Sequence, residues 1–554
     1  MSRPVKILVI VLAVFFVLLL GSWIAVKALL SDSTKQKLLT RISTVVGVPV
    51  NVGEITVDFG QFMKLQPTIS LRKVVVGNPK GFQSASLLEA DELLAQADIR
   101  SIISGNPNVE RLSVVHPVFT VERNREGITN LQALIKNVSK ESAKPSKGSA
   151  GESGGNISID EFRITGGQVN LVGMPELGGG NVVLLKDFDY ELTGFAPGKP
   201  VKSKLDASIY GGKVSHISFD GVTGPLSENS IPNVGKATVK IALAELPPPI
   251  VKKFGSLLQA PGPESIIMIA ADLKGDLYGR MTGPVQLTLD KVSIGPDAKH
   301  NMVLAGKTSG QMAVSQLLGT PSYVLQLPDA DIQFGPGRLK AKIEFAAAGT
   351  LMEGSSSGSI SGVDVRQFQQ VFAPKSMKAT GTLTVPRYSL KFSGDNPDAI
   401  VASLQGDASV QLGKGHIEGL DIVASIKSAI DNPKALGAGG GGPQTDFASA
   451  KAQLAMAKQT LNVSNIELDS STARIRGGGT VNMAQALNFR MDAFVTGSIS
   501  QLLGKNPSEE ARIPVTITGT TQNPVVRPEI KSMAVETGIN YLNKFLGGKL
   551  GKKK

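Results

Sequence analysis

Cysteine is absent from the 554-residue chain, which excludes disulfide bonds, thiolate catalysis and cysteine-ligated metals. Aromatic residues make up only 5% of the sequence, whereas there are 61 glycines and 31 prolines. This composition favours many short strands joined by tight turns over a bundle of long helices. The hydrophobic share of 41% is sufficient to bury a core.

Recognisable catalytic and metal-binding motifs are also missing. Four histidines stand far apart in the sequence: His116, His216, His300 and His416. None has the H-x-x-x-H spacing of a metal site. The pairs Asp272 with Asp276 and Asp395 with Asp398 lie in glycine- and proline-containing stretches, where aspartate favours turns.

Serine offers no catalytic signature either. No G-x-S-x-G motif is present, and "GSSSGS" from Gly354 is interpreted as a low-complexity loop. We therefore expect a non-enzymatic protein with no catalytic residues, metal ligands or cofactor. A periplasmic hydrolase is the more distant alternative, because a catalytic triad can be assembled in space from distant residues.

The formal net charge is +12, but the basic residues are mostly dispersed along the chain. Only the tail "GGKLGKKK" concentrates them, and no basic run is interleaved with aromatic residues as a nucleic-acid platform requires. Nucleic acid is therefore not an expected partner.

One uncharged apolar run, "ILVIVLAVFFVLLLGSWIAV" at 7–26, has the length of about 20 residues that spans a hydrocarbon layer of about 30 Å. Arg3 and Lys6 precede it, and Trp23 has the position of an interfacial aromatic residue. A cleaved signal peptide is the competing interpretation, but its apolar core is shorter and its cleavage site is not evident. We expect an uncleaved anchor that places the bulk of the chain in a periplasm-like compartment.

Alternating strand patterns and short amphipathic helices follow the anchor. The stretch 109–123 alternates apolar and polar residues and changes phase at Pro117. Short helices are predicted within five ranges: 127–137, 244–258, 362–374, 419–433 and 497–507. The repetition predicts an elongated, curled antiparallel β-sheet that grows strand by strand and has an apolar groove.

Changes in composition along the chain divide it into six expected segments. They are a cytoplasmic tail and transmembrane anchor (1–30), an N-terminal β region with short helices (31–138), a flexible linker (139–156), a middle β region (157–380), a C-terminal β region (381–531), and an amphipathic helix with a basic tail (532–554).

The C-terminal segment carries an apolar stripe followed by lysines. The residues concerned are Ile539, Leu542, Phe545, Leu546, Lys552, Lys553 and Lys554. A membrane-surface helix has this pattern, because apolar burial and attraction to anionic headgroups act together. A helix packed on the last strands, with solvated lysines, is an equally acceptable interpretation.

Several segments in this order resemble the AsmA family of bacterial envelope proteins. They are "VGVPVNVGEITVDF", "LRKVVVGNPKGF", "VHPVFTVERNREGITNL", "GHIEGLDI" and "RIPVTITGTTQNPVVRPEI". The resemblance is strongest over 1–140 and 380–531. It implies a bacterial inner-membrane protein with a single span, similar in architecture to chorein-type bridge-like lipid-transfer proteins.

The resemblance further implies that phospholipid acyl chains bind in a hydrophobic β-groove and that the protein supports phospholipid transport to, or lipid homeostasis of, the outer membrane. The implied partners are phospholipids, the inner membrane, and the outer membrane or envelope proteins. A non-enzymatic scaffold or assembly factor that affects outer-membrane protein biogenesis is the alternative.

Alternation along the strands at 109–123 and 157–172 selects eight candidates for lining the groove. They are Leu112, Val114, Phe119, Val121, Phe162, Ile164, Val169 and Leu171. For each of them, packing in a closed core is the alternative interpretation.

Overall fold

The computed structural model describes residues 39–40, 43, 47–58, 67–98, 101, 108–134, 158–225, 230–253, 258, 261–317, 321–373, 378–431, 444–471, 473–503 and 505–529. Within these ranges, no helix is long and apolar enough to cross a membrane. The predicted anchor at 7–26, the predicted linker at 139–156 and the predicted C-terminal helix at 532–554 lie outside them.

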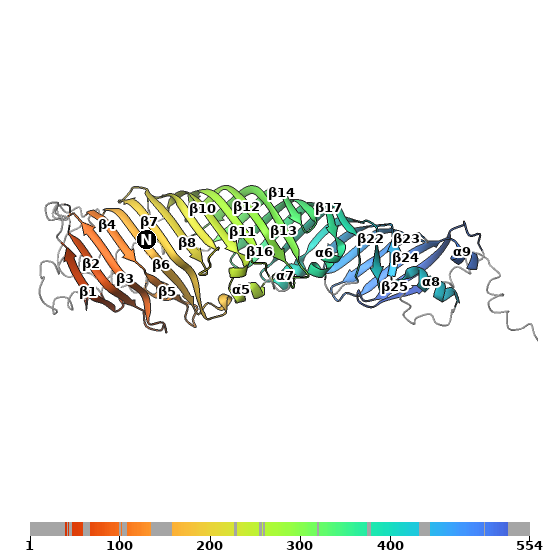
Figure 1. Ribbon diagram of the computed structural model, residues 1–554, viewed down its shortest axis with the longest axis horizontal. Coiled ribbons are helices and arrows are strands. Elements are labelled where there is room, and N and C mark those ends of the chain that lie inside the picture. Colours follow the sequence, from red (N-terminus) through yellow and green to blue (C-terminus); the bar gives the residue numbers. More distant parts are fainter. Residues whose placement is uncertain are drawn as a thin grey trace, which may run out of the picture. The chain divides into compact units, whose positions relative to one another are not determined.

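The described chain is mostly β with a few short helices, as predicted, and 24 of its strands belong to one sheet (Figure 1). The chain divides into two compact units. The first consists of Met1–Lys253, Pro263–Leu289 and Gly310–Val324, and the second consists of Phe254–Gly262, Asp290–Ser309 and Leu325–Lys554.

Successive strands of the first unit pair mostly with their neighbours in sequence. They are β1 (Val50–Asp58), β2 (Thr68–Gly77), β3 (Ser86–Ala97), β4 (Asn108–Val115), β5 (Val118–Glu122), β6 (Ser158–Val172), β7 (Asn181–Phe195), β8 (Val201–Ile209), β9 (His216–Thr223), β10 (Pro232–Ala242) and β11 (Ile266–Asp276). Antiparallel pairing joins β1 to β2 and β2 to β3, and it continues without interruption from β6 to β11. Three further strands have residues in both units: β12 (Arg280–Ile294), β13 (Met302–Ser315) and β14 (Ser322–Phe334).

The second unit repeats this arrangement. Its strands are β15 (Gly337–Ala348), β16 (Leu351–Asp364), β17 (Thr382–Gly394), β18 (Gln405–Leu412), β21 (Ser449–Ala457), β22 (Thr460–Asp469), β23 (Ala473–Asn482), β24 (Leu487–Val495), β25 (Ala511–Gly519) and β26 (Pro524–Pro528). Each of these strands pairs antiparallel with the next. The short strands β19 (Gly415–Glu418) and β20 (Gln444–Phe447) form a separate pair.

The predicted break at Pro117 divides one strand path into β4 and β5. His116 has a left-handed φ of 46° between them, and both strands pair with β6. The sheet is antiparallel as predicted except at β4–β6 and β5–β6, where the pairing is parallel. A parallel neighbour requires a long crossover connection, and the segment 123–157 is long enough to provide one.

The helices are short. They are η2 (Pro175–Leu177), η3 (Leu243–Glu245), α5 (Pro248–Lys253), α6 (Val365–Phe372), α7 (Pro397–Ser403), α8 (Ile422–Asp431) and α9 (Ser498–Leu502), and a further helix begins over 130–134. All five ranges predicted to be helical contain one. Helix α7 was not predicted: Asn396 accepts a hydrogen bond from the backbone N–H of Ala399, and Pro397 follows it as the first helical residue.

Three local assignments made from the sequence are therefore wrong. Asp398 lies in helix α7 rather than in a turn, and Asp272 lies within β11. The "GSSSGS" stretch from Gly354 is not a loop but the middle of β16. Asp276 is the last residue of β11, and its carboxylate accepts hydrogen bonds of 2.9 Å from the backbone N–H groups of Tyr278 and Gly279 in the bend that follows.

Apolar side chains gather in one packed core in the first unit and in two in the second. The first core extends from Val48 to Ala207 along the sequence. One core of the second unit joins Leu420 and α8 to β22–β25, and the other joins Met302 and α6 to β15–β17. Strand β25 shows why these residues pack: Ala511, Ile513, Val515 and Ile517 alternate with more exposed positions, so every second side chain is buried.

Candidate functional site

The structure brings the eight predicted groove residues together as four side-by-side pairs on β4, β5 and β6. The pairs are Leu112 with Phe162, Val114 with Ile164, Phe119 with Val169, and Val121 with Leu171. The first two pairs are buried in the core of the first unit, with exposed fractions of 8% or less. The other two pairs are only half-buried. Packing in a closed core therefore accounts for the first four residues. Phe119 and Val169 pack against the same core, and all four half-buried residues keep some apolar surface accessible.

An apolar ladder continues from Ile164 across the first unit. Its cross-strand neighbours are, in order, Ile164, Tyr190, Leu205, Phe219, Ala237 and Ala271. Tyr190, Leu205, Phe219 and Ala237 are half-buried, whereas the residues at the two ends are buried. A second row on the same face joins Ala207, Ile217, Val239 and Ile269. Burial raises the pKa of Tyr190, and a hydrogen bond with Ser203 opposes this effect.

The second unit carries a longer ladder of the same kind. Its cross-strand neighbours are Ala341, Gly358, Tyr388, Ala408, Leu454, Val463, Gly479, Phe489 and Ile517. Ala341, Tyr388 and Ile517 are buried in the two cores, whereas Ala408, Leu454 and Val463 are half-buried between them. A parallel row joins Leu390, Gly406, Met456, Leu461 and Val481. We call the half-buried apolar residues of each unit its apolar face.

Strand β21 shows how the sequence makes this face. Its burial alternates strictly: Ala452, Leu454 and Met456 are half-buried, and the intervening Gln453 and Ala455 are exposed. Because successive side chains of a strand point to opposite faces, one face is apolar and the other faces water. Ala408, Leu454 and Val463 were not singled out from the sequence, although the alternation in "SAKAQLAMA" carried the signal.

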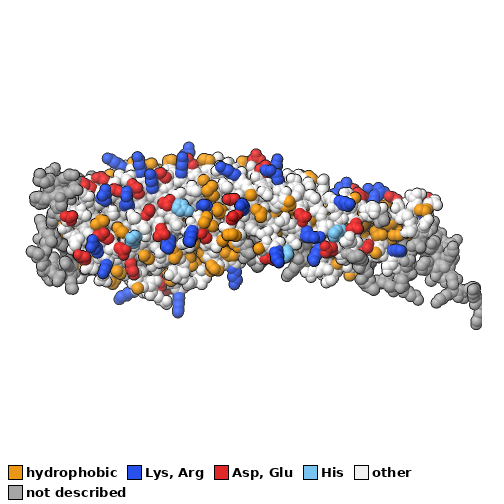
Figure 2. Space-filling view, in the orientation of Figure 1, with side chains coloured by type: hydrophobic (Ala, Val, Ile, Leu, Met, Phe, Trp, Pro, Cys, Tyr) orange, Lys and Arg blue, Asp and Glu red, His pale blue; other side chains and the backbone are white. Residues whose placement is uncertain are grey.

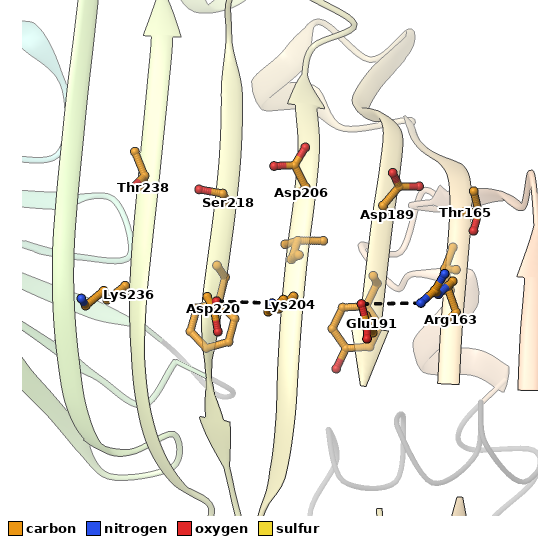
Figure 3. Close-up of a pocket in the computed structure, with 14 residues that line it drawn as sticks. Arg163, Thr165, Asp189, Glu191, Lys204, Asp206, Ser218, Asp220, Lys236 and Thr238 are labelled. Atoms are coloured by element: carbon orange, nitrogen blue, oxygen red, sulfur yellow. Dashed lines mark ion pairs between the residues drawn. The ribbon is translucent and has the colours of Figure 1, made fainter. Parts of the chain in front are cut away.

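The opposite face of the first unit is charged. Five charged residues of alternating sign lie side by side on β6 to β10: Arg163, Glu191, Lys204, Asp220 and Lys236. Figure 3 shows this row and a second, parallel row formed by Thr165, Asp189, Asp206, Ser218 and Thr238. The two rows line a trough of about 540 Å³, to which the ladder residues Ile164, Tyr190, Leu205 and Phe219 also contribute lining atoms. In Figure 2, basic and acidic side chains are likewise interspersed rather than separated.

Ion pairs along the charged row are loose and exposed. Arg163 Nη2 lies 3.8 Å from Glu191 Oε2, and Lys204 Nζ lies 3.9 Å from Asp220 Oδ2. Exposed pairs of this kind contribute roughly 0–1 kcal/mol each. The alternation of sign therefore keeps this face soluble and in register more than it adds stability.

The titratable groups of the described residues are not gathered into one reactive centre. No group of three or more His, Asp or Glu side chains within those residues is arranged to hold a metal. His116, His216 and His300 pair separately with Asp91, Asp206 and Asp297. His416 contacts the hydroxyl of Thr380 at 3.1 Å, and its Nε2 lies 3.8 Å from Glu418 Oε1.

Two buried or half-buried glutamates have structural roles that the sequence did not reveal. Burial alone would raise the pKa of Glu122, but hydrogen bonds from Ser84 and Gln83 outweigh this effect and the pKa is lowered. Glu245 behaves similarly, because its carboxylate accepts hydrogen bonds from the backbone N–H groups of Lys213, Val214 and Ser215. Both carboxylates tie a loop to a strand end or helix.

A second cavity, of about 470 Å³, lies beside α6 in the second unit. Its charged lining residues are His300, Arg366, Lys378 and Glu418. Arg366 lies 3.7 Å from Glu418, so the carboxylate partly offsets the cation. Three of the lining residues, Arg366, Gln369 and Gln370, form the polar side of α6, and Ala373 caps its C-terminal end. Phe368 and Phe372 lie on the other side of the helix, with ring centroids 4.9 Å apart.

No protein-family model, curated protein or solved structure matches this chain.

Proposed function

We propose that the apolar faces of the two units bind phospholipid acyl chains non-covalently, in a hydrophobic β-groove formed by curling of the sheet. The observation that carries this proposal is the ladder Ala408, Leu454 and Val463, in which neighbouring strands present half-buried apolar side chains on one face and polar ones on the other. An apolar surface of this kind is unfavourable in water unless a ligand or partner covers it.

The size of the effect fits this ligand class. Transfer of one methylene from water to an apolar surface contributes about 0.8 kcal/mol, so the tails of one phospholipid would cost on the order of 20 kcal/mol to expose. Side chains repeated at every strand provide contacts to a tail along the ladder. Because the contacts are similar from strand to strand, a tail can move along them without a large barrier.

In the cell, the protein would be anchored in the inner membrane, would extend into the periplasm, and would support phospholipid transport to the outer membrane or its lipid homeostasis. The predicted span at 7–26 and the resemblance to the AsmA family support this part of the proposal. The same two points support the assignment as a non-enzymatic carrier.

The test is lipid retention by the detergent-extracted, full-length protein, with bound phospholipid quantified by mass spectrometry. Leu454→Arg places a charge on the apolar face, and Ala455→Arg is the matched control because the adjacent residue points to the other face. We expect phospholipid to co-purify with the wild-type protein and with Ala455→Arg, but not with Leu454→Arg. A wild-type protein that carries no lipid would overturn the proposal.

A scaffold that contacts envelope proteins is the second candidate function. It is favoured by the exposed neighbours Val222 and Val234, which lie side by side on the charged face with exposed fractions of 41% and 56%. Under this function, Val234→Asp would abolish partner retention and leave lipid content unchanged. Under the lipid-binding function, it would change neither the lipid content of the protein nor the lipid homeostasis of the outer membrane.

A further inference from the structure

Phenylalanine rings of the apolar faces lie over glycines. The three atoms nearest to an ideal β-carbon built on Gly354 all belong to the ring of Phe392: they are Cζ, Cε1 and Cε2. Phe392 lies directly opposite Gly354, on β17. A β-carbon on Gly235 would lie 2.5 Å from Cε2 and 2.6 Å from Cζ of Phe219 on the neighbouring strand. The rings thus occupy the space that a side chain at the glycine would fill.

This position fixes the direction in which the rings point. A side chain that stands perpendicular to the sheet would leave its cross-strand neighbour free. Phe219 and Phe392 instead lean across the neighbouring backbone and lie along the sheet. Both residues are half-buried, and neither is among the residues that form or pack against the described cores.

We infer that in the pairs Phe392–Gly354 and Phe219–Gly235 the glycine lets the ring lie flat on the sheet. The ring therefore does not project from the apolar face, and the space next to that face is left for the acyl chain. This inference rests on the proposed function and names residues that determine how much cargo the face accepts. Glycine is needed beneath each ring, directly opposite Phe392 at Gly354 and diagonal to Phe219 at Gly235, because any larger residue would push the ring towards the cargo side.

Gly354 offers the cleanest test. Its three nearest neighbours are all atoms of the Phe392 ring, whereas a β-carbon at Gly479 would also meet the backbone oxygen of Asn488. Gly354 has no left-handed φ, so alanine is compatible with its backbone. Leucine lacks Cε1, Cε2 and Cζ, and Phe392→Leu therefore removes all three atoms that conflict with a β-carbon at 354.

The experiment compares four full-length proteins in detergent: wild type, Gly354→Ala, Phe392→Leu and the double variant. Binding of phosphatidylglycerol with one fluorescent acyl chain is titrated for each, and thermal unfolding is followed in parallel. If a displaced ring excludes about two methylenes, Gly354→Ala weakens binding on the order of tenfold, because each buried methylene contributes a factor of about four. The double variant should bind like Phe392→Leu, close to wild type.

The possible outcomes separate the two proposals. Wild-type protein that binds no fluorescent lipid overturns the proposed function itself. If wild type binds lipid and folded Gly354→Ala binds it equally well, only the inference is overturned. The inference is also overturned if Gly354→Ala weakens binding and the added Phe392→Leu does not recover it. Should Gly354→Ala fail to fold, Gly235→Ala with and without Phe219→Leu provides the comparison in the first unit, where a β-carbon at 235 also lies 3.1 Å from the backbone oxygen of Asp220.

Discussion

The carboxylate of Glu122, at the end of β5, accepts a hydrogen bond of 2.7 Å from the backbone N–H of Ser84, which is 38 residues earlier in the chain. A second hydrogen bond comes from the N–H of Gln83 at 2.8 Å. The backbone N–H of Glu122 itself donates to the side chain of buried Asn130 at 3.1 Å. Glu122 on β5 is therefore joined to residues 83–84 through its carboxylate and to Asn130 through its backbone N–H.

Glu122→Gln should lower the free energy of unfolding at neutral pH and make that free energy less dependent on pH in the acid range. The pKa of Glu122 is lowered in the folded state, so its stabilising contribution is present above the unfolded pKa and is lost as pH falls through the folded pKa. An amide cannot accept both backbone hydrogen bonds with the strength of a carboxylate, and we expect a loss of about 1–3 kcal/mol at pH 7. Urea unfolding measured between neutral and acidic pH provides the check.

The exposed Glu126→Gln is the control, since it changes the same charge a few residues away without removing a buried acceptor. It should change neither the free energy of unfolding at neutral pH nor the way in which that free energy falls at acidic pH. Equal effects of Glu122→Gln and Glu126→Gln would show that the buried hydrogen bonds contribute nothing specific.

The two halves of the predicted groove set should respond differently to charge. Val121→Lys and Leu171→Lys alter half-buried positions, where a long cationic side chain can reach water. We expect these variants to fold and to lose bound lipid. Leu112 is 2% exposed, and Leu112→Lys should instead unfold the first core, because an unpaired buried charge is strongly unfavourable.

Thermal unfolding and lipid content, measured on the same preparations, distinguish these results. Lipid-free but normally stable Val121→Lys supports the proposed groove. If Val121→Lys and Leu171→Lys are stable and carry the wild-type amount of lipid, this part of the face does not contact the ligand.

How far the sequence predicts this fold is clearest at Pro117. The phase change there was predicted, and the structure places Leu112 and Phe119 opposite Phe162 and Val169 on the same strand, β6. Parallel pairing was not predicted, because the alternation of apolar and polar residues is the same in a parallel and an antiparallel strand with one solvated face. The pairing partner depends on a long-range contact that local pattern does not encode.

Gly354 shows a second limit. A stretch of glycine and serine has no apolar alternation, so "GSSSGS" was interpreted as a loop, yet it is held as a strand by neighbours on both sides. The ring of Phe392 supplies the apolar cover that the stretch itself lacks. Glu122 was missed for a related reason, since its partners at Gln83 and Ser84 are distant in sequence.

The charged row of the first unit predicts a salt-dependent effect. Glu191 lies between Arg163 and Lys204, so Glu191→Lys places three cations side by side on neighbouring strands. Like charges opposite one another should destabilise the sheet by about 0.2–1 kcal/mol, and added salt should reduce the loss. Chemical unfolding at low and high ionic strength measures both effects.

Ser218→Lys on the same face is the matched control. It introduces the same side chain beside Asp206, with a net change of one charge where Glu191→Lys changes two, so it should not destabilise the protein. A similar loss for both lysine variants, independent of salt, would contradict an electrostatic origin.

The absence of cysteine allows the apolar faces to be mapped one position at a time. Val463→Cys places a thiol on the apolar face of β22, and Ser464→Cys places one on the exposed side of the same strand. If acyl chains cover the face, a soluble maleimide should label residue 463 slowly in lipid-loaded protein and faster after delipidation, because the tail excludes water and reagent from the thiol. Labelling of residue 464 should be equal in both states, since its side chain faces solvent throughout. If the thiol at residue 463 reacts at the same rate before and after delipidation, lipid does not cover this part of the face.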